Sequence, residues 1–136
     1  MIQWEKRYAT GDESVDKQHQ MLFEFFNEFE DCVKQGKGKE FLKETFPLLE
    51  SYAAAHFKYE EQCMQVHHCP AADENKAAHQ TFVLKLDEIK KKYQTGQYDD
   101  ETIAQVHHFV EDWITQHIIG LDTQLRACIK KEMPCP

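Results

Sequence analysis

The sequence predicts an all-α protein, an antiparallel up-down-up-down four-helix bundle with a short C-terminal helix. Apolar residues recur every three or four positions in four segments of about 20 residues each. Strand patterns are weak, and the sequence contains no Asn-Gly or Asp-Gly hairpin turn. The 5 glycines and 4 prolines lie mostly between the four segments. The connections are therefore short, and neighbouring helices must run antiparallel.

The first two helices are expected over residues 14–35 and 39–66. We expect Ser14 to cap the start of the first helix and Gly36 to end it. The second periodic segment contains Pro47. Because proline lacks a backbone N–H, Pro47 is expected either to kink the second helix or to mark its effective start.

The third and fourth helices are expected over residues 71–94 and 99–119. Gly96 follows the third helix and provides its stop signal. Gly120 interrupts the fourth apolar pattern, and a short last helix is expected over residues 121–131. The sequence thus predicts four long helices and one short one.

Composition narrows the range of possible functions. A chain of 136 residues fits one domain over 1–136, and 41% hydrophobic residues are enough to build a core, which excludes disorder. The formal net charge of −8 argues against nucleic acid and anionic lipid as partners. No apolar run approaches the roughly 18 residues of a membrane span, so we expect no membrane insertion. The first residues lack the apolar core of a secretion signal.

The cysteine pattern bears on the cellular compartment. The 5 cysteines are an odd number, and no two of them form a Cys-x-x-Cys motif. This pattern favours free thiols in a reducing compartment, and hence a cytoplasmic location. Cys63 falls on an apolar seam and is expected to be a small buried core residue.

Polar residues occupy seam positions that the bundle should bury. A buried carboxylate or unpaired imidazole costs several kcal/mol unless it is compensated, although a single such histidine is usually an ordinary core residue. The polar residues fall early in the first and third helices and late in the second and fourth. In an antiparallel bundle these positions share one end, while the other end of each seam is apolar. The polar seam residues are His19, His56, Glu60, Asn75, His79 and His117.

This gathering of donors predicts a metal site. His56 and Glu60 are four residues apart, so both project from one face of a helix. Imidazoles and a carboxylate without thiolates suit iron or manganese, and less specifically zinc. A bound dication would supply the counter-charge that a buried Glu60 needs. Asp122 lies five residues after His117, so periodicity turns it toward solvent, although Gly120 permits a distortion that brings it inward.

Several motifs follow one another along nearly the whole chain, and none of them is diagnostic alone. They are Trp4, the stretches 11–19 and 56–61, Met64, Pro70, and the stretches 79–82 and 113–122. In this order they resemble the hemerythrin family in its single-domain bacterial form. The resemblance implies a non-haem site of two carboxylate-bridged iron ions that binds O2 reversibly.

Carried over residue by residue, the resemblance assigns roles to the candidate ligands. His19 and His56 would ligate the iron that keeps an open position for O2. Glu60 and Asp122 would bridge the two irons, which places Asp122 in the site despite its periodicity.

The second iron is where this chain departs from the family. His79 and His117 would belong to it, but the family's His-x-x-x-His pair reads Asn75 to His79 here. The second iron would then lose its third imidazole, because an asparagine is a weak neutral donor. We hypothesise that this change alters the second site and favours O2 activation, peroxide turnover or rapid autoxidation over clean O2 carriage.

The leading interpretation is an O2-binding protein for storage, delivery or sensing rather than a catalyst, with an unidentified O2-consuming enzyme as a possible partner. One alternative is a di-iron enzyme acting on O2, peroxide or NO, and a second is a metal-free helical interaction module. The family's apolar O2 pocket is matched by Trp113, Ile114, Ile118 and Ile119. The remaining histidines are expected at the surface or in turns: His67, His68, His107 and His108.

Overall fold

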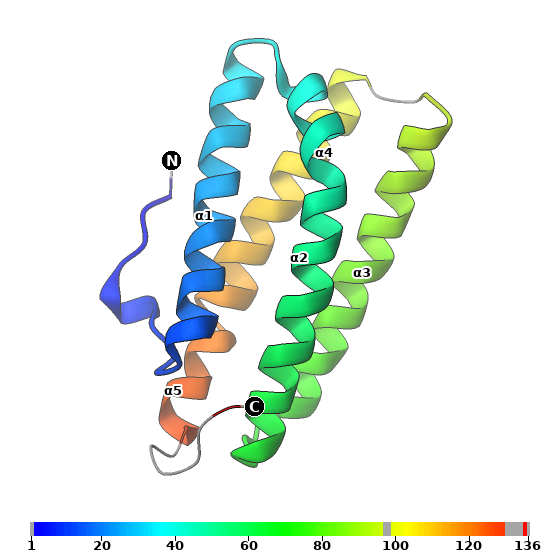
Figure 1. Ribbon diagram of the computed structural model, residues 1–136. Coiled ribbons are helices and arrows are strands. Elements are labelled where there is room, and N and C mark those ends of the chain that lie inside the picture. The colour runs from blue at the N-terminus through cyan, green and yellow to red at the C-terminus, as the bar shows by residue number, and fades with distance from the viewer. Residues whose placement is uncertain (1, 97–98, 130–134, 136) are drawn as a thin grey trace.

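The computed structural model describes residues 2–96, 99–129 and 135. Four long helices form the molecule: α1 (Glu13–Lys34), α2 (Gly38–Val66), α3 (Ala72–Gln94) and α4 (Asp100–Asp112). Successive helices run in opposite directions, with α1 packed on α2 and α4, and α2 packed on α3 (Figure 1). The described residues contain no strand. The predicted all-α bundle is confirmed.

A short N-terminal segment lies along α1 (Figure 1). It includes a 3-10 helix over Lys6–Tyr8. The Asn27 side chain holds this segment, because it accepts from the Ile2 N–H at 2.9 Å and donates to the Ile2 carbonyl at 2.7 Å. The aromatic rings of Trp4 and Phe23 pack edge to face. The segment therefore covers one side of the core.

Aspartate side chains cap the N-termini of α1 and α4, and the cap of α1 differs from the predicted one. Asp12, not Ser14, caps α1, because its carboxylate accepts from the Val15 N–H at 3.0 Å. A carboxylate at this position also suits the positive end of the helix dipole. Asp99 caps α4 in the same way through the Thr102 N–H at 2.9 Å.

Pro47 does not begin a helix. α2 starts at Gly38 and continues through Pro47 to Val66, so the expectation that Pro47 marks its start is wrong. The alternative, a kink at Pro47, stays a prediction. Gly38 leaves room at the start of α2 for two apolar side chains, because a Cβ there would lie 2.9 Å from the Val33 side chain and 3.1 Å from that of Ile103.

Aromatic and branched side chains fill the bundle interior. The largest of them are almost wholly inaccessible to solvent, and burial of each such side chain contributes about 1.5–3 kcal/mol. This packed interior holds the four helices in register and so fixes the positions of the polar residues at one end. The most deeply buried apolar side chains include Phe26, Phe29, Leu42, Phe82, Val106 and Ile114.

The end of the fourth helix departs from regular α geometry. α4 passes at Trp113 into a π-helical segment, Trp113–Ile118, in which the Ile119 N–H donates to the Ile114 carbonyl five residues back at 3.0 Å. A 3-10 turn over Asp122–Gln124 and α5 (Leu125–Cys128) follow. The last helix predicted over 121–131 is therefore much shorter, and its residues 130–131 lie outside the described residues.

This irregular segment buries Asp122. The side chain is wholly shielded from solvent, so the periodicity-based expectation that it faces solvent is wrong. A wider π turn changes the angular offset between His117 and Asp122 relative to an unbroken α-helix, in which they would diverge by about 140°. The two side chains instead meet, with His117 Nε2 at 3.0 Å from Asp122 Oδ1.

The cysteines are mostly paired. Cys63 is joined to Cys135 and Cys69 to Cys128, which ties the C-terminal segment to α2 and to the turn after it. The prediction of free thiols is wrong for these four residues, and Cys32 alone is free among the five. The expectation of a cytoplasmic location loses this support. Within the described part of the chain, no helix has the length and apolar character needed to cross a bilayer.

Replacing Gly120 with alanine is expected to lower the free energy of unfolding by about 1–3 kcal/mol. An alanine Cβ would lie 2.5 Å from the Gln116 carbonyl oxygen, a backbone atom that no rotamer change can move. Urea unfolding measures the effect. The control is Gln116→Ala, an exposed substitution in the same segment, which should stay within about 0.5 kcal/mol of the parent chain. Equal stability of the two variants would contradict the role of Gly120.

Candidate metal centre

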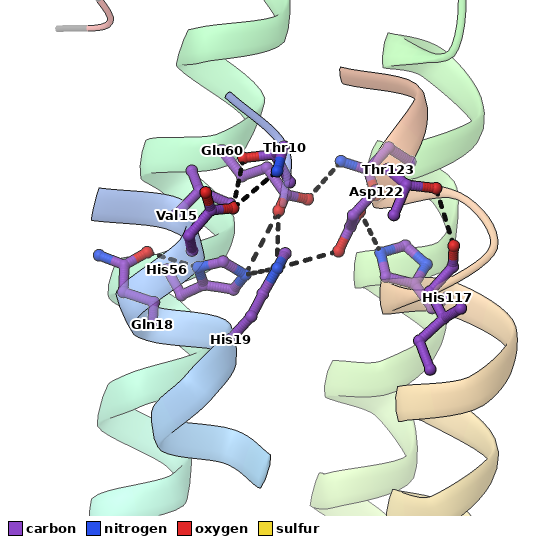
Figure 2. Close-up of polar contacts among 12 residues, drawn as sticks. Thr10, Val15, Gln18, His19, His56, Glu60, His117, Asp122 and Thr123 are labelled. Carbon is purple, nitrogen blue, oxygen red and sulfur yellow. Dashed lines mark hydrogen bonds and ion pairs between the residues drawn. The ribbon is translucent and has the colours of Figure 1, made fainter. Parts of the chain in front are cut away.

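The six polar seam residues and Asp122 meet at the end of the bundle that carries α5. α1 contributes His19, α2 contributes His56 and Glu60, and α3 contributes Asn75 and His79. The segment after α4 contributes the last two residues, His117 and Asp122. Figure 2 shows the labelled members of this set pointing toward one another between the helices. All seven are buried.

The donors form two groups that overlap. The first contains His19, His56, Glu60 and Asp122, and the second contains Glu60, His79, His117 and Asp122. Within each group, one ligand atom from every residue lies within 4.8 Å of the others. Glu60 and Asp122 belong to both groups, so these two carboxylates connect the two sites. This is the arrangement of a carboxylate-bridged pair of ions in a helical bundle.

The atoms around His19 are spaced as ligands of one cation. His19 Nε2 lies 3.1 Å from His56 Nε2, 3.2 Å from Glu60 Oε2 and 3.1 Å from Asp122 Oδ2 (Figure 2). A single ring proton cannot serve three acceptors at once. Ligands at right angles around a dication, with bonds of about 2.1 Å, lie about 3 Å apart. The donor set therefore fits a metal ion.

The second group shows the same need for a cation. His79 Nε2 lies 3.1 Å from Glu60 Oε1, and His117 Nε2 lies 3.0 Å from Asp122 Oδ1. Nevertheless both ring nitrogens and both Asp122 oxygens are buried without a hydrogen-bond partner, because the atoms are close but not aligned. A buried carboxylate in this state is strongly disfavoured unless a cation compensates it.

The electrostatics of the site favour positive charge. Burial disfavours the imidazolium form of His19, but its contacts with Asp122 and Glu60 outweigh burial and raise the pKa of His19 to about 10. Burial also opposes ionisation of Glu60, yet His19, His56 and His79 hold the pKa of its carboxyl well below the ordinary value. Without a metal, the carboxylates draw a proton onto His19. A dication would supply that charge instead.

Partners on the far side of two rings fix their tautomers. His56 Nδ1 donates to Gln18 Oε1 at 2.5 Å, and His79 Nδ1 donates to Glu61 Oε2 at 3.2 Å. Each ring then presents an unprotonated Nε2 to the centre, which is the form that binds metal. Neither Gln18 nor Glu61 was identified from the sequence, although Gln18 directly precedes His19 and Glu61 directly follows Glu60.

Aromatic rings wall the centre. Phe57 stacks on His79 with centroids 3.9 Å apart, and Trp113 stacks on His117 at 3.8 Å. Tyr52 stacks on His56, and its hydroxyl donates to the Gln18 carbonyl. Phe57 and Tyr52 were not singled out from the sequence, because an aromatic residue on a helix usually reads as core. Such stacking restricts ring rotation and keeps water away.

The four predicted O2-pocket residues fall in or beside the π-helical segment. Ile114 and Ile118 are fully buried, whereas Trp113 and Ile119 are half-buried and pack against the core. Two of the four residues therefore belong to the buried core, and the other two are partly exposed to solvent.

Asn75 is buried and contacts a carboxylate. Its amide nitrogen donates to Glu60 Oε1 at 2.6 Å and approaches Met64 Sδ at 3.2 Å. Its carbonyl oxygen has no hydrogen-bond partner. In this conformation Asn75 holds Glu60 in place, and the oxygen that would serve as a weak ligand is not engaged.

The other histidines do not join either group. His68 and His108 are exposed, and His107 is half-buried beside Glu30, as expected of surface residues. His67 lies in the turn after α2, as expected, but its side chain is buried next to Cys63 rather than exposed.

Ferrous iron is expected to raise the thermal stability of the metal-free chain, by about 2.7 kcal/mol at an ion concentration 100 times the Kd. The reason is that the ion neutralises Glu60 and Asp122, and Asp122→Asn should therefore lose much of the effect. Asp112→Asn, which changes an exposed acid on α4, is the matched control and should keep it. Calorimetry under anaerobic conditions measures the shift. A melting temperature that iron does not change would support the metal-free interaction module instead.

Known proteins give an independent comparison. The family model "Hemerythrin HHE cation binding domain" matches residues 10–125. A bacteriohemerythrin of Methylococcus capsulatus is 29% identical over 122 residues, covering 90% of this chain and 91% of the relative. A bacteriohemerythrin of Pseudomonas aeruginosa is 25% identical, covering 96% of this chain and 82% of the relative. One of Clostridium acetobutylicum is 28% identical, covering 91% and 98%. With a match over most of its length, the chain belongs to the hemerythrin family.

Proposed function

We propose that this chain is a non-haem di-iron protein that binds O2 reversibly, for storage, delivery or sensing. The observation that carries the proposal is the sharing of Glu60 and Asp122 between two groups of ligands. Two adjacent ions bridged by carboxylates are what such sharing provides. Membership of the hemerythrin family supports non-haem iron as the metal and O2 as the ligand.

In this proposal some residues would ligate a single iron and others would bridge the two irons. His19 and His56 would hold one iron, and Glu60 and Asp122 would bridge it to the second. Bound ferrous ions would supply the electrons and the coordination position that O2 binding requires. The tautomer of His56 is already set for this task by Gln18.

The second iron would be held by His79 and His117 together with the shared carboxylates. Glu61 accepts from His79 Nδ1, and a carboxylate in this position makes the imidazole a stronger donor. This partner offsets part of the loss of an imidazole at Asn75.

Apolar side chains would protect the bound O2 from protons and water. Ile114 and Ile118 are fully buried, and the ring of Trp113 lies flat on His117. In a water-excluded environment, proton delivery to reduced oxygen is slow, which favours release of O2 over irreversible oxidation.

A specific observation favours a second candidate function, an enzyme acting on O2, peroxide or NO. Asn75 donates to Glu60 rather than presenting its oxygen as a ligand, so the second iron would have fewer protein donors than the family pattern provides. A further open position favours substrate binding and turnover at that iron.

Repeated oxygenation tests the proposed function. We expect the iron-loaded chain to develop an oxygenated absorption band that disappears on deoxygenation and returns over several cycles. Oxidation within the first cycle, together with peroxide turnover proportional to bound iron, would favour the enzyme.

Asn75→His is expected to raise affinity for the second iron by roughly 10-fold or more and to slow autoxidation, because it restores an imidazole. Asn75→Ala is the matched control, since it removes the hydrogen bond to Glu60 without adding a ligand. Iron stoichiometry and the rate of band decay measure both effects. Autoxidation at one rate in all three chains would show that residue 75 does not control the second iron.

A further inference from the structure

We propose that Cys63, His67 and Cys135 form a second, separate metal site for a thiophilic dication such as Zn2+. The site becomes available when the Cys63–Cys135 disulfide is reduced. This inference lies outside the proposed O2-binding function and does not depend on it.

The three residues come together from two parts of the chain that are far apart in the sequence. Cys63 lies in the last turn of α2 and His67 is the C-cap four residues later, whose backbone N–H donates to the Cys63 carbonyl at 3.2 Å, so the two side chains lie on the same side of the helix end. Cys135 lies beside Cys63, because the two sulfur atoms are bonded to each other. One ligand atom from each residue lies within 4.8 Å of the other two.

The chemistry of this group differs from that of the di-iron candidate. Two thiolates and one imidazole are soft and borderline donors that select Zn2+ and similar ions. The O2-binding candidate offers only imidazoles and carboxylates. Cys63 follows Glu60 by three residues, yet neither ligand group of that centre contains it. The two sites would therefore load with different metals.

Two of the three ligands, Cys63 and His67, are positioned without the disulfide. Cys63 is buried in α2 and His67 is buried in the turn that directly follows it, and Leu125 packs into a small apolar cluster with Cys63, Met64 and Cys69. Leu125 is fully buried, so its packing helps to hold α5 beside the end of α2.

A small thiol reductant can open the Cys63–Cys135 disulfide by thiol–disulfide exchange. Two reductant thiols reduce the Cys63–Cys135 disulfide to two cysteine thiols and are themselves oxidised to a disulfide. A dication then displaces the two cysteine protons and forms two metal–thiolate bonds, with no further transfer of electrons. Oxidation of the cysteines by a disulfide reverses the sequence and releases the ion.

Cobalt titration tests the site, because Co2+ substitutes for Zn2+ and gives intense sulfur-to-cobalt charge-transfer absorption. The iron-loaded chain is titrated anaerobically with Co2+ after reduction by a water-soluble phosphine, which takes up one oxygen from water as it delivers two thiols. We expect one thiolate-bound Co2+ per chain in the reduced protein and no such absorption without reductant.

Variants assign the absorption to these residues. Cys135→Ser lies outside the helices and should abolish it, and His67→Ala should weaken Co2+ binding by about 10- to 100-fold. Cys32→Ser and the pair Cys69→Ser with Cys128→Ser are controls that keep the full signal. Absence of charge-transfer absorption in the reduced chain, or its persistence in Cys135→Ser, would overturn the proposal.

Discussion

The structure depends on the burial of two carboxylates among four imidazoles. Glu60 and Asp122 are both shielded from solvent, and several of the facing nitrogens and oxygens lack aligned hydrogen bonds. Burial of these carboxylates costs free energy in a metal-free protein, whereas bound cations make it favourable. Glu60 and Asp122 also raise the pKa of His19, because a proton on this imidazole neutralises part of their negative charge. The remaining features of this end of the bundle make sense as supports for that centre.

The helices position the ligands of the centre in different ways. α1 and α2 hold one another through the contact of Gln18 with His56, and α2 and α3 through that of Glu61 with His79. The fourth helix uses a π-helical segment that turns both His117 and Asp122 inward. π segments in α-helices are uncommon and often mark functional sites. Their local cost is compensated by the position they give to a charged side chain.

Helical periodicity predicted the bundle, its four long helices and the shared location of the six polar seam residues. It failed at Asp122, because a periodicity argument assumes an unbroken α-helix and the π segment breaks that assumption. Only the resemblance to hemerythrins placed Asp122 inward. Cysteine spacing failed because Cys63 and Cys135 are 72 residues apart and are paired by the fold rather than by a motif. Asp12 displaced Ser14 as the cap because both residue types cap well, and sequence does not rank them.

The most direct test of the centre is diffraction at the iron absorption edge from crystals of the ferrous-loaded chain. We expect two anomalous peaks, one beside His19 and His56 and one beside His79 and His117, with Glu60 and Asp122 in contact with both. No iron peak, or imidazoles turned outward with only ordered water between the carboxylates, would contradict a structure organised around two bound cations.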